Sequence, residues 1–164
     1  MNPTAIGRRT WLAALVAAAT AGLGAQQLLE RVVARVNGSP VFLSDMRAAV
    51  GFGLIDPGTD SAQTEQMVRR RVLLGEVSRF PPSDPSAADI GAEVMRMKGR
   101  VRDAAAFQRE QGLSDQEVQS LARDSLRIEA YLAQRFGAAR PKDAVEQWMK
   151  ELEGRADVVY PGVP

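Results

Sequence analysis

LLERVVARVNGSPVFLSDM, residues 28–46, is the stretch of sequence that decides the fold. Valines lie on both sides of Asn37 and Gly38, a pair that tolerates positive φ and is typical of a two-residue hairpin turn. Pro40 has no backbone N–H, so the second arm should be short and lie at a sheet edge. A two-stranded hairpin alone is only marginally stable in water. The stretch therefore predicts a hairpin that needs a third strand or a helix to cover it.

Helical periodicity dominates most of the chain after this hairpin. Ser44 is expected to begin a first helix, with an apolar face that continues to Ile55 before Asp56-Pro57-Gly58 ends it. Ser114 and Glu117 have the spacing of a capping box, the clearest helix start in the sequence. Apolar residues recur at helical spacing in five further segments, around residues 61–79, 90–101, 103–111, 114–136 and 141–153.

A short strand is expected at residues 156–160, near the end of the sequence. This strand can pair with the early hairpin and supply the third strand that the hairpin lacks. The two ends would then close around a helical body. The expected fold is mainly α, with a small β-hairpin paired with a C-terminal strand.

The first 25 residues have the order of a secretory signal peptide. Arg8 and Arg9 provide a positive start, residues 11–23 carry no charge, and small residues follow before Gln26. The uncharged run is shorter than the roughly 20 residues of a spanning helix, which favours a cleaved signal over a membrane anchor. Arg8 and Arg9 also partly resemble a twin-arginine signal, but nothing suggests the cofactor that such cargo often carries. We expect residues 1–25 to be removed on general secretion and residues 26–164 to form one domain in the periplasm, with no stable membrane insertion.

The composition excludes several classes of function. The 164 residues include no Cys and no His, and 21 Lys and Arg are balanced by 20 Asp and Glu. A disulfide scaffold, a thiolate metal site and a histidine base are therefore excluded, and no basic excess favours nucleic acid. The sequence has no phosphate-binding loop and no nucleophile elbow. We expect neither a cofactor nor an enzymatic activity.

Two groups of charged residues were considered as sites. Arg69, Arg70 and Arg71 are consecutive, so on a helix their side chains point about 100° apart and cannot form one patch. Asp124 and Glu129 are five residues apart, a spacing that does not stack carboxylates on one face. Both groups are expected to be solvated surface charge.

Methionines supply the candidate peptide-binding residues. Met46, Met67 and Met97 lie in expected helices, as does Val50. Methionine is flexible, and surfaces that accept many sequences often use it. Ordinary core packing is the alternative for each of these residues. The four form the candidate site for an extended polypeptide.

Residues 29–46 resemble the start of the N-terminal domain of SurA-type periplasmic chaperones, with a valine-rich strand, an Asn-containing turn, a short strand and a Ser-Asp helix start. Residues 65–79, 105–136 and 144–160 resemble the later helices and last strand of that domain more loosely. The resemblance implies an ATP-independent chaperone that binds unfolded outer-membrane proteins. Members usually carry parvulin-type isomerase domains before the last helix, but Phe136 and Trp148 leave no room for one here.

Three functions are therefore open. The first is a peptide-binding chaperone without isomerase activity. The second is a structural or adaptor module of the cell envelope that binds one specific partner. The third is a prolyl isomerase, which the absence of histidine and of a parvulin domain disfavours.

Overall fold

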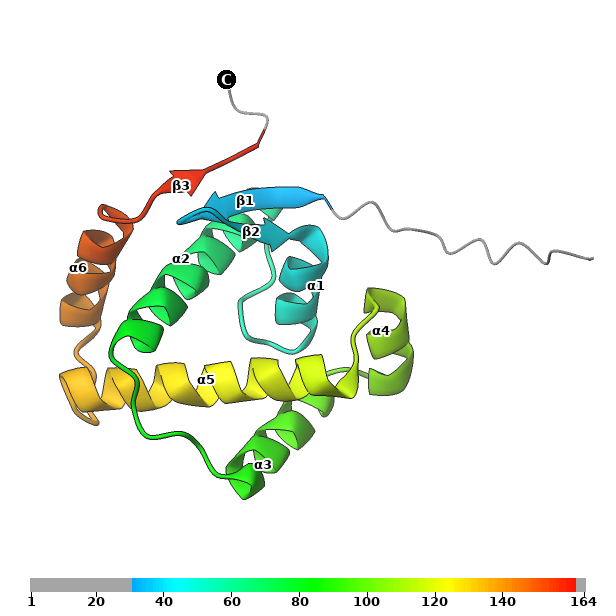
Figure 1. Cartoon of the computed structure of the whole chain (residues 1–164). Helices are drawn as coiled ribbons and strands as arrows, with labels where there is room; N and C mark the ends of the chain where they lie inside the picture. The colour runs from blue at the N-terminus through cyan, green and yellow to red at the C-terminus, as the bar shows by residue number, and fades with distance from the viewer. Residues whose placement is uncertain (1–30, 162–164) are drawn as a thin grey trace, which may run out of the picture.

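The computed structural model describes residues 31–161, and Figure 1 shows how they are arranged. The predicted signal peptide, residues 1–25, lies outside the described residues. Residues 31–161 form three strands and six helices, so the expected mainly α fold with a small sheet is confirmed. In chain order these are β1 (Val32–Val36), β2 (Ser39–Phe42), α1 (Leu43–Gly51), α2 (Asp60–Arg79), α3 (Ala87–Lys98), α4 (Ala104–Gln111), α5 (Asp115–Phe136), α6 (Lys142–Glu153) and β3 (Val158–Val159).

The antiparallel sheet joins the two ends of the described chain. Its strand order is β2-β1-β3, with β1 in the centre. The hairpin turns at Asn37 and Gly38, whose φ angles of 50° and 79° are the positive values that such a turn requires. Asn37 forms two hydrogen bonds with Asp157, the residue before β3. The N–H of Asn37 donates to the carbonyl of Asp157 at 2.7 Å, and its Oδ1 accepts from the Asp157 N–H at 3.0 Å. The predicted pairing of the hairpin with the C-terminal strand is confirmed.

One core cluster lies between the sheet and the helices α1, α2 and α6, and it includes the C-terminal half of α5. Val41, Met46 and Val77 are among its fully buried side chains. Trp148 from α6 stacks on Tyr131 of α5, with ring centroids 5.9 Å apart. These contacts fix α6 against α5 and bring β3 to the edge of β1 (Figure 1).

A second core cluster holds α3 and α4 against the N-terminal half of α5. Its buried members are Phe52, Ile90, Met97, Val118 and Ala122. The ring of Phe107 in α4 packs edge-on against Phe52, with centroids 5.3 Å apart. The 22-residue α5 helix is about 33 Å long at 1.5 Å per residue, and it bridges both clusters (Figure 1).

The first helix is shorter than the sequence predicted. α1 begins at Leu43 and ends at Gly51, whereas the apolar pattern suggested a helical face as far as Ile55. Gly53 has a φ of +65°, which a continuing helix cannot adopt. The N–H groups of Leu54 and Ile55 both turn back to the carbonyl of Ala49, at 2.7 and 3.4 Å. The apolar residues after Gly51 are therefore placed by a turn, not by a helix.

The other helix ends agree with their sequence signals to within a few residues. Ser114 Oγ accepts from the N–H of Glu117 at 3.2 Å, and Glu117 accepts from the N–H of Ser114 at 2.7 Å, so the predicted capping box is formed. Gly112 ends α4 in the left-handed conformation. α3 stops at Lys98, so Val101, predicted to lie on its apolar face, follows the helix and packs against the second cluster.

Candidate functional site

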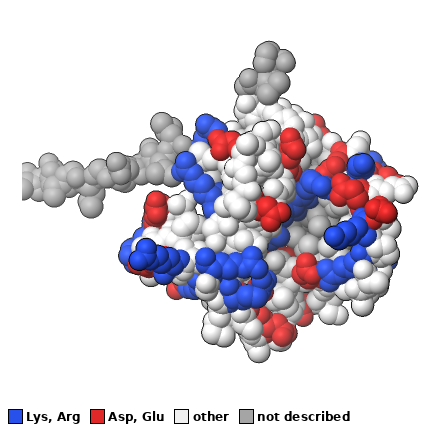
Figure 2. Space-filling model, turned by 180° about the vertical axis from the view of Figure 1, so that it is seen from behind, with Lys and Arg blue, Asp and Glu red and all other residues white. Residues whose placement is uncertain are grey.

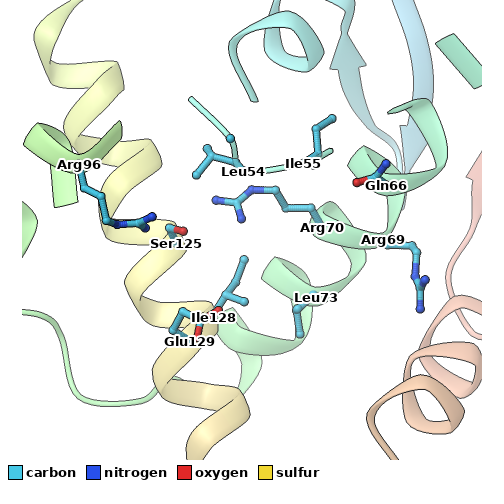
Figure 3. A pocket seen from close by; sticks show the side chains of 11 residues that line it. Leu54, Ile55, Gln66, Arg69, Arg70, Leu73, Arg96, Ser125, Ile128 and Glu129 are labelled. Atoms are coloured by element: carbon cyan, nitrogen blue, oxygen red, sulfur yellow. The ribbon is translucent and has the colours of Figure 1, made fainter. Parts of the chain in front are cut away.

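An open cleft lies between the two core clusters, where α2, α5 and the loop after α1 meet. Its volume is about 540 Å³, within the range of about 300–1,000 Å³ that is typical of ligand sites. Four apolar side chains from these elements line it: Leu54, Ile55, Leu73 and Ile128. Its polar and charged lining residues are Gln66, Arg69, Arg70, Arg96, Ser125 and Glu129 (Figure 3).

The cleft opens at a position where α5 presents a short side chain. Leu121, Ser125, Ile128 and Leu132 follow one another along the inner stripe of this helix, and all are at least partly buried. Ser125 is the smallest of them, so it leaves space where a larger apolar residue would fill the gap. The side chain of Arg70 extends from α2 toward Ser125 (Figure 3). The cleft thus has a mixed apolar and polar lining, and the side chains of Arg70 and Arg96 both extend toward Ser125 (Figure 3).

Arg70 lacks the contacts that a buried guanidinium normally has. Its Nη2 atom is fully buried and has no hydrogen-bond partner among the described residues. Burial lowers the pKa of Arg70 below its ordinary value, and the negative charges of Asp124 and Glu93 oppose that shift. Buried polar groups are nearly always hydrogen-bonded, and an arginine remains charged in proteins. Arg70 is therefore a charged donor that the fold itself does not satisfy.

The carboxylates near Arg70 do not accept hydrogen bonds from its guanidinium. Glu93 is buried and is held in a two-contact ion pair by Arg96, which lies on the same helix, α3. Asp124 is half-buried on α5; burial raises its pKa, against the attraction of Arg70, Arg127 and two further arginines. Asp124 thus balances the charge of Arg70 through space, without a hydrogen bond.

The two neighbours of Arg70 are tied to other elements. Arg69 forms ion pairs with Glu146 at 2.8 Å and with Glu153 at 2.9 Å, both on α6. Arg71 pairs with Asp45 of α1 at 2.9 Å. The 100° step between consecutive residues turns the three arginines toward different parts of the protein, as expected. The expected solvation holds in part, since the side chains of Arg69 and Arg71 are 37% and 39% exposed although both are ion-paired. Of the two carboxylates expected at the solvated surface, Glu129 is exposed and pairs with Arg140, whereas Asp124 is half-buried.

The four residues predicted from sequence to bind a peptide lie elsewhere. Met46 and Met67 are buried in the first core cluster, and Met97 is completely buried in the second. Val50 is partly buried against the first cluster. None of the four lines the cleft. In this conformation the methionines pack the interior, which is the use that apolar periodicity alone would assign to them.

Sequence reasoning missed the residues that do line the cleft. One signal was present, because Arg70 lies three residues after the buried Met67 and three before the buried Leu73, on the inner face of α2. A charged residue at such a position is exceptional. Leu54 and Ile128 gave no such signal, because apolar residues in a turn and in a helix look like ordinary core.

The surface as a whole carries charge of both signs. Figure 2 shows basic and acidic side chains interspersed over the face opposite to that of Figure 1, and not separated into two poles. The chain is also nearly neutral overall. A ligand of either sign is therefore not drawn in by a global field, and selectivity depends on the groups inside a site.

None of the helices within residues 31–161 combines the length and the apolar character that crossing a bilayer requires. Comparison of the chain with models of protein families, with curated proteins and with solved structures gives no match. The function is therefore argued from the sequence pattern and the cleft.

Proposed function

We propose that this protein is an ATP-independent chaperone of the periplasm, which binds unfolded or extended polypeptides, with outer-membrane proteins as its clients. The observation that carries the proposal is the open cleft between the two cores, with a mixed apolar and polar lining and one arginine that has an unsatisfied nitrogen. The export pattern of residues 1–25 supports the compartment.

The cleft suits transient contact with a chain segment. Leu54 is partly exposed and, with the small exposed parts of Leu73 and Ile128, offers a limited apolar surface to a client side chain. The open form of the cleft lets a longer segment run past on either side. Binding of this kind uses burial of apolar area and needs no nucleotide. A shallow site with little apolar area favours rapid release, which a chaperone requires.

The arrangement of the chain ends is consistent with the SurA-type resemblance. β3 follows α6 and pairs with β1, and only residues 137–141 join α5 to α6. The connection is too short for an inserted isomerase domain. We therefore propose the peptide-binding core of such a chaperone, without prolyl isomerase activity.

The proposal is tested by the aggregation of an unfolded outer-membrane protein on dilution from urea. The purified chain should suppress light scattering at several-fold molar excess. Ser125→Leu should weaken this suppression, because the larger side chain fills the cleft. Ser120→Leu is the matched control, since Ser120 lies on the exposed face of the same helix, and it should behave like the unchanged protein.

The other two functions predict different results. A structural or adaptor module would show no suppression and would bind a single envelope partner in a fixed ratio. A prolyl isomerase would accelerate cis–trans exchange of a proline peptide at high protein concentration, where we expect no acceleration. Absence of suppression at all ratios would reject the chaperone proposal.

A further inference from the structure

We infer that Arg70 recognises a carboxylate on the polypeptide that enters the cleft, so that the site selects segments with a negative group beside an apolar one. This inference deepens the proposed function and rests on it. Four observations support it: the full burial of Arg70 Nη2, the lack of a hydrogen-bond partner for that atom, the apolar residues beside it in the cleft, and the engagement of the charged residues nearby.

First, Arg70 lies where a charged side chain is energetically unfavourable. Keeping a partly buried charged group without hydrogen bonds is unfavourable, yet the half-buried Arg70 occupies a position on α2 that an apolar residue could fill. Its Nη2 atom has no acceptor anywhere in residues 31–161. Arg127 also has a buried nitrogen without a partner, but of the two only Arg70 lines a cleft that a ligand could enter.

The second step excludes the internal carboxylates as lasting partners. Glu93 is occupied by Arg96, and Asp124 acts on Arg70 only through its charge. Glu129, the one acidic residue that lines the cleft, is paired with Arg140. Nη2 itself is fully buried, but Arg70 as a whole is half-buried and lines the cleft, so an acceptor from outside would meet its other N–H groups.

The third step identifies the acceptor. A guanidinium presents a planar fork of donors that matches the two oxygens of a carboxylate, and such charge-assisted hydrogen bonds are about twice as strong as neutral ones. The other charged lining residues, Arg69, Arg96 and Glu129, are all ion-paired within the protein, which leaves Arg70 as the unpaired charge of the cleft. The adjacent Leu54 and Ile128 would contact the apolar side chain next to that carboxylate. On a polypeptide the carboxylate can be an Asp or Glu side chain or the chain end.

The experiment compares two pairs of fluorescent peptides that share one apolar sequence. The first pair ends in a free carboxylate or in an amide. The second pair has both ends blocked and carries an internal Asp or Asn. Affinity is measured by fluorescence anisotropy with the purified chain. The side-chain Nε–H signal of Arg70 is followed by nuclear magnetic resonance, with Arg70→Met used to assign it.

We expect at least one acid peptide to bind about ten- to a hundredfold more tightly than its neutral counterpart, the range expected for hydrogen bonds between charged groups. The preference should disappear in Arg70→Met, and the Arg70 signal should shift only with the acid peptide. The pair that shows the preference identifies the source of the carboxylate. Arg127→Met is the matched control, because Arg127 also has a buried, unsatisfied nitrogen but does not line the cleft, and it should keep the preference.

Two outcomes separate this inference from the proposed function. If acid and neutral peptides bind equally, or if Arg127→Met loses the preference as fully as Arg70→Met, the carboxylate inference is rejected while binding itself supports the chaperone. If no peptide binds and aggregation is not suppressed, both are rejected.

Discussion

Val36 of β1 and Val158 of β3 are register partners across the strand pair that closes the fold. Val36 is 4% exposed and belongs to the first core cluster. Val159, the next residue of β3, pairs with Arg35 and is 50% exposed. The same two-residue strand thus has one side turned to the core and one to solvent.

This difference predicts unequal effects of two small truncations. Val36→Ala should lower the free energy of unfolding by about 2 kcal/mol, from lost apolar burial and a residual cavity. Val159→Ala should change it by less than about 0.5 kcal/mol, as for other exposed sites. Urea denaturation followed by circular dichroism measures both. Equal losses of unfolding free energy would show that the buried side chain of Val36 contributes no more to stability than the exposed side chain of Val159.

Replacing two glycines by alanine should change the free energy of unfolding in opposite directions. Gly75 lies inside α2 with open space where a Cβ would stand, so Gly75→Ala should raise the free energy of unfolding by about 1 kcal/mol. Gly53 has a φ of +65°, and an added Cβ would lie 1.9 Å from Nη1 of Arg100. Gly53→Ala should therefore lower it by about 1–3 kcal/mol. The same urea titration checks both, and stabilisation by Gly53→Ala would contradict the turn described for residues 51–55.

The Arg70→Met substitution should not destabilise the protein. It removes a half-buried guanidinium whose Nη2 atom has no hydrogen-bond partner and retains the aliphatic volume, while the charge of Asp124 keeps the attraction of Arg127, Arg71 and Arg123. We expect an unchanged or higher thermal midpoint. Arg69→Met should lower the midpoint, because it removes the ion pairs from α2 to α6. A large loss of stability in Arg70→Met would mean that Asp124 depends on Arg70 more than its charge interactions indicate.

The ion pair of Arg69 with Glu146 predicts a dependence of stability on pH. The hydrogen bond and charge of Arg69 lower the pKa of Glu146 below its ordinary 4.5. A carboxyl whose pKa is lowered by folding stabilises the protein above its unfolded pKa, and this contribution is lost as the pH falls through the folded pKa. Glu146→Gln should therefore reduce the midpoint of unfolding at neutral pH, and the difference from the unchanged protein should vanish in acid.

The effect should be small, because Glu146 is exposed and water screens the pair. Glu151→Gln, on the same helix, serves as the control, since no ion pair within the described chain involves the Glu151 side chain. Thermal unfolding monitored across the acid range distinguishes the two variants. A difference that persists at the lowest pH would assign the effect of Glu146→Gln to something other than its charge.

The sequence was sufficient for the architecture but not for the cleft. The Asn37-Gly38 turn and the Ser114 capping box are local signals, in which a few neighbouring residues determine the backbone, and both are formed as predicted. The pairing of β3 with β1 could be predicted because a two-stranded hairpin alone is only marginally stable and requires a third strand or a covering helix. The end of α1 was misjudged, because Phe52 and Ile55 are apolar whether a helix or a turn brings them to the core.

The cleft depends on tertiary packing that periodicity does not encode. Arg70 lines the cleft because α2 and α5 lie on either side of it near Ser125, and α5 packs in both core clusters. Likewise, Met97 lies on the expected apolar side of its helix, where both core packing and peptide binding were open from the sequence, and it is fully buried. A prediction from residue type alone therefore assigned the methionines to the binding site and the arginines to the solvent-exposed surface.

The closure of the sheet also sets when the fold can be completed. Asn37 and Asp157 are hydrogen-bonded across 120 positions of the chain, so one edge of the central strand stays unpaired until residue 157 has been synthesised. Contacts of this range carry a large loop-closure cost and form late. During synthesis the hairpin therefore depends on the helices for cover, and the third strand joins it only after α6 has been made.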